Sequence, residues 1–304
     1  MIKKIYVTNY LNETLEVELA NPYKTGFVIT SIEGLGPPKA TISTLATSYK
    51  DGTTFSKSKA EQRNIVLGIK FDNSRISDSI EDIRQKTYRV FPVKRKLKIK
   101  IETTNKTVFT EGYVESNTPA IFDREEGTSI SILCPDSFFY SEEIEKTFFN
   151  SAKPLFEFPF SNESLTEKQL IFSEQQQLSD NYIKYSGDEE VGIEMLINIT
   201  GDVTNISVIN NLTREIMRIN SGRFAQVVGS GIADKDLIII NTTIDNRGIT
   251  LIREGISYNI LNSLDRYTDW IRLSEGYNVF SIYADSGIEN IQAEIRNRIR
   301  YEGV

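Results

Sequence analysis

The sequence predicts a mainly β protein with two domains. Short segments rich in β-branched or alternating apolar residues succeed one another, and Gly, Asn, Asp or Pro residues lie between them. One stretch in the first half has helical periodicity instead. An apolar segment ends near residue 140 and the charged stretch Ser141–Lys146 follows it. We therefore expect domains over residues 1–140 and 141–304.

The first domain is predicted to contain a single helix, with five strands before it and three after it. The expected strands are Lys4–Tyr10, Thr14–Leu19, Phe27–Glu33, Thr41–Tyr49, Asn64–Phe71, Leu97–Thr103, Thr107–Glu115 and Ser129–Cys134. Between the third and the fourth, Gly34–Pro38 (Gly-Leu-Gly-Pro-Pro) breaks the pairing. Pro supplies no ladder donor and Gly tolerates a positive φ, so we interpret this motif as a structural turn.

A single amphipathic helix is expected at about residues 76–88. The apolar positions at helical spacing are Ile76, Ile80 and Ile83. Asn73 or Ser74 is placed to cap the amino terminus, and Pro92 prevents the helix from continuing much beyond Val90. We expect this helix to pack on the sheet as a structural element.

The second domain is predicted to be an antiparallel sandwich or jelly roll without a long helix, because Gly-bearing turns separate many short segments. Before this series lies the aromatic segment Pro154–Phe160, which is predicted to be an edge strand or an arm on a partner. The expected strands are Ile193–Ile199, Val203–Ile209, Glu215–Ile219, Phe224–Val228, Leu237–Asn241, Ile249–Ile252, Ser257–Leu261, Trp270–Leu273, Asn278–Ala284 and Ile288–Ile295.

Composition excludes the common catalytic centres. The chain has no His, which removes imidazole bases, proton shuttles and metal ligands. Its one Cys, Cys134, cannot form an intramolecular disulfide, so nothing requires an oxidising compartment. No phosphate loop, dinucleotide fingerprint, calcium loop or zinc pattern is present. We expect no catalytic residue, no metal and no cofactor.

Acidic pairs are the remaining candidates for chemistry. A glycosidase needs two carboxylates across a cleft, whereas the pairs here are sequence neighbours that point to opposite faces of a strand or into solvent. The pairs are Glu125 with Glu126, Glu142 with Glu143, and Glu189 with Glu190. A carboxylate glycosidase therefore has little support.

Charge argues against nucleic-acid binding, since the formal net charge is −7. The basic strip Lys94–Ile101 alternates, with Leu97, Ile99 and Ile101 on one face and Lys96, Lys98 and Lys100 on the other. This is the pattern of a half-buried strand with a charged solvent face. No secretory signal and no stretch of about 20 apolar residues is present, so we expect no membrane insertion.

The single tryptophan suggests one possible ligand platform. If Ile271 and Leu273 face the core, Trp270 and Arg272 share the outer face, where they could contact a sugar ring or a partner protein. The alternative is a core Trp, with the strand in the opposite register.

The order of several motifs resembles the siphophage distal tail protein family, over nearly the whole chain. The resemblance rests on Gly34–Thr41, Asp51–Phe55, Arg63–Leu67, Tyr88–Pro92, Leu133–Asp136, Leu155–Phe160 and Arg298–Val304. It implies a β-sandwich or split-barrel amino-terminal domain that forms a hexameric ring at the end of the tail tube. It also implies a carboxy-terminal sandwich like galectins and carbohydrate-binding modules.

The resemblance implies a set of partners and a place. The expected partners are the tail tube protein, a tail-associated hub protein, the tape-measure protein and receptor-binding proteins. DNA would pass through the ring without specific binding. The place would be the virion tail tip, assembled in the bacterial cytoplasm, and no enzymatic activity follows.

The sequence also suggests which residues could form the contacts between subunits of the ring. The lysines of the basic strip could pair with acids of a neighbouring subunit, a heterologous contact of the kind that closes rings. The candidate ring residues are Ile76, Ile80, Ile83, Lys96, Lys98 and Lys100. The alternative function is a carbohydrate-binding adhesin that acts through its carboxy-terminal sandwich and Trp270.

Overall fold

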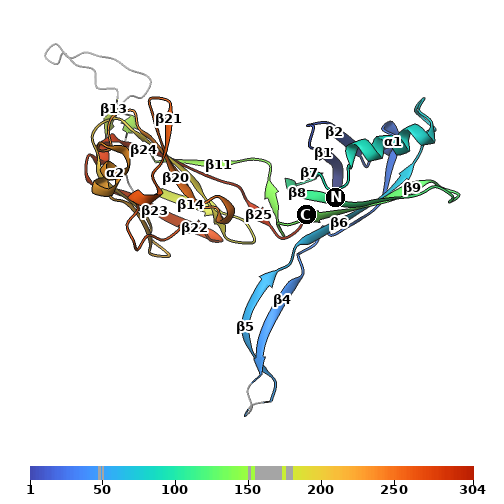
Figure 1. The fold of residues 1–304 in the computed structure, drawn as a ribbon, viewed down its shortest axis with the longest axis horizontal. Helices are drawn as coiled ribbons and strands as arrows, with labels where there is room; N and C mark the ends of the chain where they lie inside the picture. Colours follow the sequence, from blue (N-terminus) through green and yellow to red (C-terminus); the bar gives the residue numbers. More distant parts are fainter. Residues whose placement is uncertain (47–48, 50, 150–151, 155–172, 176–180) are drawn as a thin grey trace. The chain divides into compact units, whose positions relative to one another are not determined.

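The computed structural model describes residues 1–46, 49, 51–149, 152–154, 173–175 and 181–304 (Figure 1). The chain divides into two compact units. Unit 1 contains Met1–Glu143 together with Arg300–Val304, and unit 2 contains Ile144–Ile299. The last five residues thus fold with the first unit, although the sequence places them in the second predicted domain, 141–304.

Unit 1 is built from strands, one α-helix and one short 3₁₀ helix. Its elements are β1 (Ile2–Thr8), β2 (Thr14–Glu18), η1 (Pro22–Lys24), β3 (Phe27–Glu33), β4 (Ala40–Ala46), β5 (Thr53–Ala60), β6 (Arg63–Phe71), α1 (Ile80–Val90), β7 (Lys96–Thr103), β8 (Thr107–Ala120), β9 (Gly127–Cys134), β10 (Phe139–Ser141) and β25 (Arg300–Tyr301).

One curved antiparallel sheet forms the body of unit 1. The strand order is β2-β1-β7-β8-β9-β6-β3, and β10 joins β8 to β25. The long strand β8 pairs with β7 along its first half and with β9 along its second. Its register shifts between Val114 and Ser116, and such bulges bend a strand. The sheet can therefore fold over itself around one core.

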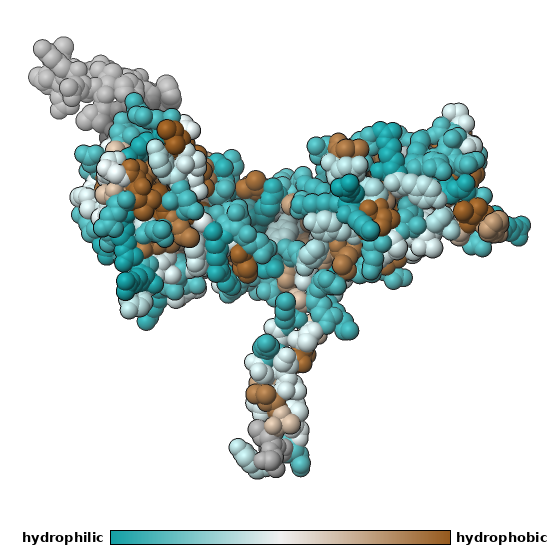
Figure 2. All heavy atoms as spheres, viewed as in Figure 1, coloured by the Kyte–Doolittle hydropathy of each residue, from teal (hydrophilic) through white to brown (hydrophobic). Residues whose placement is uncertain are grey.

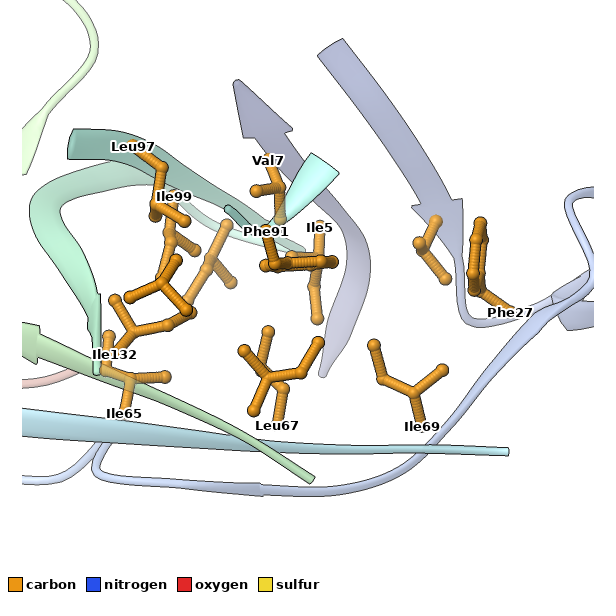
Figure 3. Packing of buried hydrophobic residues seen from close by; sticks show 14 of the residues in the cluster. Ile5, Val7, Phe27, Ile65, Leu67, Ile69, Phe91, Leu97, Ile99 and Ile132 are labelled. Atoms are coloured by element: carbon orange, nitrogen blue, oxygen red, sulfur yellow. The ribbon is translucent and has the colours of Figure 1, made fainter. Parts of the chain in front are cut away.

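The core of unit 1 lies between the two halves of this sheet. Along most strands of this sheet, alternate residues point inward, as the period of two requires. Figure 3 shows Ile5 and Val7 of β1 opposite Leu67 of β6, with the ring of Phe91 between them. The helix α1 adds Ile83, which is fully buried.

The helix begins later than the sequence predicts. Its N-cap is Ser79, whose hydroxyl accepts from the backbone N–H of Asp82, while the Asp82 carboxylate accepts from the Ser79 N–H at 3.1 Å. This reciprocal capping box fixes the first turn, so the predicted caps Asn73 and Ser74 are wrong. The helix ends at Val90, just before Phe91 and Pro92, as expected.

Unit 2 consists almost entirely of antiparallel strands. Its elements are β11 (Glu145–Phe149), β12 (Ala152–Pro154), β13 (Ser173–Gln175), β14 (Asn181–Tyr185), β15 (Val191–Gly192), β16 (Glu194–Ile199), β17 (Thr204–Asn210), β18 (Glu215–Ile219), α2 (Ser221–Val228), β19 (Leu237–Asn241), η2 (Ile244–Asn246), β20 (Gly248–Arg253), β21 (Ile256–Asn259), η3 (Leu261–Ser263), β22 (Arg272–Leu273), β23 (Gly276–Ser286), η4 (Ile288–Asn290) and β24 (Ile291–Asn297).

Two larger sheets form most of unit 2, beside the two-stranded sheets β12-β13 and β15-β22. One has the order β11-β24-β16-β19-β20-β21 and the other the order β14-β23-β17-β18. Each sheet buries alternate residues on one face, as the layers of a sandwich do. A mainly β chain of two units is thus confirmed.

One predicted strand is wrong. Residues 224–228 belong to the helix α2, which Asn220 caps by accepting from the N–H of Arg223 at 3.1 Å. Gly229 ends the helix in the left-handed conformation at φ 87°. Phe224, on the inner side of this helix, is fully buried. The caps at both ends outweigh the β propensity of the short apolar run between them.

The strand β5 was not predicted, since its residues are mostly Ser, Thr and Lys without an apolar alternation. Apart from Pro154 in β12, the predicted edge strand or arm Pro154–Phe160 lies outside the described residues. Within the described part of the chain, no helix is both long and apolar enough to cross a bilayer.

The capping box gives a prediction about acid titration. Hydrogen bonds from Ser79, chiefly from its hydroxyl, hold the pKa of Asp82 below its ordinary value. The carboxylate therefore stabilises the fold above its unfolded pKa, and this contribution is lost as the pH falls through the lower folded pKa. Ser79→Ala should raise the pKa of Asp82 toward its ordinary value, as measured by NMR titration of the carboxyl carbon.

A matched control is available in the loop before the helix. Ser74 similarly lowers the pKa of Asp72. Ser74→Ala should therefore raise the pKa of Asp72 and leave that of Asp82 unchanged. An Asp82 pKa that does not move in Ser79→Ala would contradict the capping assignment.

Candidate functional site

Several exposed apolar side chains of unit 1 lie on a two-stranded ribbon, formed by β4 and β5, that leaves the body of the unit (Figure 1). The strands pair from Ala40 with Ala60 to Ala46 with Thr53. No other strand among the described residues pairs with the ribbon. An isolated two-stranded hairpin is only marginally stable in water, so this element lacks the support that the rest of the sheet has.

The two faces of the ribbon differ in chemistry. One face carries Ile42 and Phe55, which are 64% and 62% exposed, between small Ala, Thr and Ser residues. The opposite face carries Lys57 and Lys59 beside Leu45, which is 60% exposed. Figure 2 shows hydrophobic residues (brown) along the projecting ribbon. The strands contain no acidic residue, so the ribbon is apolar on one face and basic on the other.

A buried arginine holds the base of the ribbon to the body of unit 1. Arg63, at the start of β6, is only 4% exposed. Its guanidinium donates to the carbonyl oxygens of Gly34, Gly36 (2.5 Å), Ser137 (2.9 Å) and Glu302 (2.6 Å). The five donors of Arg in a fixed fork suit such a set of acceptors.

An aromatic ring completes the surroundings of this arginine. The Arg63 guanidinium carbon lies 4.4 Å from the centroid of the Phe139 ring. Burial lowers the pKa of Arg63, yet a guanidinium remains charged at neutral pH. One cation therefore joins the turn before the ribbon, the segment before β10 and the end of the chain.

The turn before the ribbon requires glycine. Gly34 has φ +82°, and a Cβ atom placed on it would lie 2.0 Å from the carbonyl oxygen of Asn64. The next residue, Leu35, accepts a hydrogen bond from the N–H of Val304 at 3.0 Å. The Gly-Leu-Gly-Pro-Pro motif is thus a turn, as predicted, and it is the place where the terminal segment is held.

The predicted ring lysines all lie on β7 but have partners within their own unit. Lys96 Nζ lies 2.7 Å from Glu111 Oε2, and Lys98 Nζ lies 3.2 Å from Glu142 Oε2. Lys100 Nζ lies 4.5 Å from the centroid of the Tyr6 ring. Their alternation on an outer face matches the sequence analysis, whereas their role between subunits stays a prediction.

The three predicted helix residues separate in the structure. Ile83 is fully buried in the core, so its side chain is not on the surface of the unit. Ile76, which precedes the helix, and Ile80 are half-buried and pack against the same core. Most of their apolar surface is therefore already used within the subunit.

Trp270 and Arg272 lie on the same, outer side of their segment, as the sequence predicts. Ile271 and Leu273 are fully buried, and Trp270 and Arg272 are half-buried. The guanidinium carbon of Arg247 lies 5.6 Å from the Trp270 ring, a cation–π contact. Arg272 Nη1 lies 3.6 Å from Glu190 Oε2. A ligand role for this pair stays a hypothesis.

At least one member of each acidic pair forms an ion pair with a basic side chain. Glu125 pairs with Lys70 and Glu126 with Arg84, at 2.8 and 3.1 Å. Among the described residues, no group of His, Cys, Asp and Glu is arranged to hold a metal ion. Burial raises the pKa of Cys134 to about 11, so its thiol stays protonated at neutral pH.

Sequence reasoning missed the two features that dominate unit 1. The ribbon strand Thr53–Ala60 has no apolar alternation, and only the Gly52 turn and the matching length of β4 signal a hairpin. In the sequence, Arg63 is marked only as the first residue of the motif Arg63–Leu67. Its acceptors lie 27 to 239 residues away along the chain, so no local pattern marks it.

Comparison with solved structures identifies the fold. The SPP1 Dit (gp 19.1) protein matches with a TM-score of 0.64 and 10% sequence identity, over 97% of this chain and 98% of that chain. The chain has a Dit-like fold. The resemblance to phage distal tail proteins is thereby confirmed at the level of the fold.

Two structures of the phage P2 baseplate in its activated conformation share the Dit-like fold. The form with Ca matches over the whole of both chains, with a TM-score of 0.53 and 13% identity. The form with Sr matches over 99% of both, with a TM-score of 0.50 and 12% identity. No protein-family model and no curated protein sequence matches the chain.

The turn at the base of the ribbon can be tested by substitution. Gly34→Ala should lower the free energy of unfolding by more than about 2 kcal/mol, because the methyl group meets a backbone oxygen at a positive φ. Gly52→Ala is the matched control, since Gly52 has φ +86° with nothing within 4 Å. It should cost only about 1 kcal/mol.

Chemical denaturation monitored by circular dichroism measures both values. Equal losses in the two variants would show that the close approach to Asn64 does not constrain the turn.

Proposed function

We propose that this chain is a structural component of a phage tail tip. In this proposal it forms a hexameric ring hub that joins the tail tube to the baseplate and anchors host-adhesion proteins. Support comes from the fold, since SPP1 Dit is described as a paradigm of the hub adsorption apparatus in phages that infect Gram-positive hosts. A chain of the phage P2 baseplate shares the fold over its full length.

The exposed ribbon is the structural feature that best supports the proposed hexameric ring. Its apolar face exposes Ile42 and Phe55 to solvent in the single chain, and its strands have no third strand beside them. Contiguous exposed apolar surface on a soluble protein marks a place where another molecule packs. A contact between this ribbon and a different surface of the next copy is heterologous, and such contacts close into rings.

Charge favours a second copy of the chain as the molecule that covers the ribbon. The two strands of the ribbon carry two lysines and no acid, whereas the whole chain has a formal net charge of −7. A basic ribbon is therefore attracted to the acidic surface of its own neighbours. The same negative balance lets DNA pass through the ring without specific binding.

The remaining parts of the proposal follow from this role. Its partners are the tail tube protein, a tail-associated hub protein, the tape-measure protein and receptor-binding proteins. Its place is the tip of the virion tail, after assembly in the cytoplasm of the bacterial host. The protein works through its interfaces, without enzymatic activity and without a cofactor.

The decisive experiment combines native mass spectrometry with negative-stain electron microscopy of the purified chain. We expect a six-fold ring with a central channel at high protein concentration. A chain that stays monomeric at every concentration, and that also fails to form rings when it is mixed with purified phage tail tubes, would overturn the proposed function.

The ribbon contact is tested by a double variant. Ile42→Asp with Phe55→Asp should dissociate the ring, because burying two carboxylates in an apolar interface is unfavourable. Both side chains are largely exposed in the single chain, so the fold should survive. Sedimentation velocity would measure the shift from ring to monomer.

Leu212→Asp is the matched control, since Leu212 is 62% exposed and lies in unit 2. Its oligomeric state should match that of the unaltered chain. A ring that persists in the ribbon variant would exclude the ribbon as the subunit contact.

The lysine hypothesis from the sequence makes a separate prediction. If Lys96, Lys98 and Lys100 pair with acids of a neighbour, changing all three to Glu should weaken the ring. Each lysine already has a partner in its own unit, so circular dichroism must show that the variant is folded. An unchanged oligomer in native mass spectrometry would remove these lysines from the interface.

A further inference from the structure

The end of the ribbon contains the pair Asp51–Gly52, between the strands β4 and β5 (Figure 1). It is the only place in the sequence where Gly follows an Asp or an Asn. The backbone nitrogen after an Asp can attack the side-chain carboxyl carbon, and a five-membered succinimide ring results. A side chain on the following residue hinders this attack, so Gly is the most favourable follower.

The surroundings of this pair leave both reacting groups open. Asp51 and Gly52 are exposed and lie in a bend outside the strands. Gly52 has φ +86°, and a Cβ atom placed on it would have no atom within 4 Å. Among the described residues, none accepts a hydrogen bond from the Gly52 N–H or donates one to the Asp51 carboxylate. Water can therefore reach both groups.

The ribbon gives the turn little support. Its strands pair only with each other among the described elements, and the pair nearest the turn is Ala46 with Thr53. Two-stranded hairpins are only marginally stable in water, and exposed loop tips are where a chain is most easily altered. The backbone at Asp51 can thus rotate until its carboxyl carbon meets the Gly52 nitrogen.

Several other Asp and Asn residues precede a small residue, but the fold restrains them. In these pairs Ser follows, and the Ser N–H that would attack donates a hydrogen bond. The bonds run from Ser74 to Asp72 Oδ1 (2.8 Å), from Ser79 to Asp82 Oδ2 (3.1 Å), from Ser221 to Asn205 Oδ1 (2.8 Å) and from Ser263 to the Ile260 carbonyl (2.9 Å). Each bond must break before the nitrogen can react, which is costly.

Two further Asp residues before Ser have carboxylates that already accept hydrogen bonds. The donors are the Phe138 N–H (3.1 Å) and the Tyr140 hydroxyl (2.6 Å) for Asp136, and Asn205 Nδ2 (2.7 Å) and Arg218 Nη2 (3.0 Å) for Asp285. The pair Asn150–Ser151 lies outside the described residues. Of the pairs that the structure describes, Asp51–Gly52 alone has no such restraint.

We propose that Asp51 converts to isoaspartate through a succinimide, without an enzyme. The Gly52 nitrogen bonds to the side-chain carboxyl carbon of Asp51, whose hydroxyl leaves with the proton of the nitrogen as water. A second water adds to one ring carbonyl and breaks the bond from that carbon to the nitrogen. Breaking the bond to the side-chain carbon restores Asp51. Breaking the bond to the main-chain carbon leaves the chain running through the side chain, which is isoaspartate.

One water is lost and one is gained in this sequence, so no other reactant is needed. The hydroxyl that leaves belongs to the protonated carboxyl. The conversion is therefore faster at mildly acidic pH than at neutral pH.

The product changes the turn that joins the two ribbon strands. Isoaspartate adds one carbon to the main chain, and the length of a hairpin loop fixes the register of its strands. The pairing that begins at Ala46 and Thr53 is therefore disturbed. Ile42 and Phe55 lie on these strands, so the change reaches the apolar face of the ribbon. Only its effect on assembly rests on the proposed function.

The test is incubation of the full chain at mildly acidic and at neutral pH, followed by tryptic digestion and mass spectrometry. We expect the peptide Asp51–Lys57 to accumulate as two isomers of equal mass, through an intermediate lighter by one water, and faster at the acidic pH. Isoaspartate methyltransferase should label this peptide. The peptide that contains Asp136 is the internal control and should stay unlabelled. A single isomer of Asp51–Lys57, or equal labelling of both peptides, would overturn the proposal.

Substitutions assign the reaction to the succinimide. Asp51→Asn should form the same ring several-fold faster at neutral pH, because ammonia leaves in place of water. Asp51→Glu would require a six-membered ring and should leave the peptide as one isomer. The residue is exposed, so both variants should fold. Equal rates in the unaltered chain and in Asp51→Asn would contradict this route.

The modification and the ring are measured separately. Hydrogen exchange of the amides in β4 and β5 should be faster in the modified chain, and equal exchange would contradict the effect on the ribbon. If Asp51 converts but no ring forms in native mass spectrometry, the proposed function fails and this proposal stands. If the ring forms and Asp51 does not convert in the free chain, this proposal alone fails.

Discussion

The buried guanidinium of Arg63 is the interaction on which unit 1 depends. A charge in a nearly closed site is costly unless its hydrogen bonds are satisfied, and here carbonyl oxygens from separate parts of the chain satisfy them. No single one of these segments could supply the set. The turn at Gly34, the segment at Ser137 and the residue Glu302 are therefore brought together by one side chain.

This arrangement explains why a long ribbon can leave the body of the unit without a third strand. The ribbon is fixed at its base, where the turn before β4 meets Arg63 and where the N–H of Glu61 donates to the Lys39 carbonyl at 2.7 Å. Beyond that base its side chains are exposed. A ribbon that is hydrogen-bonded at its base and exposes an apolar face beyond it is suited to binding a separate surface.

Much of the fold could be predicted from local pattern, because alternation and turn residues act over a few positions. The strands Phe27–Glu33 and Leu237–Asn241 have the predicted bounds, and the outward side of Trp270 follows from its buried neighbours. Ribbon strand β5 could not be predicted, since none of its side chains is buried by the unit. Arg63 could not be recognised either, because its partners are distant along the chain.

The return of β25 to unit 1 has a consequence for the order of folding. Synthesis proceeds from the amino terminus, and Glu302, the last acceptor of Arg63, lies 239 residues after it. Until that residue leaves the ribosome, the guanidinium has one bond fewer and the turn at Leu35 lacks the N–H of Val304. Unit 1 therefore gains the last of these contacts only after the whole of unit 2 has been synthesised.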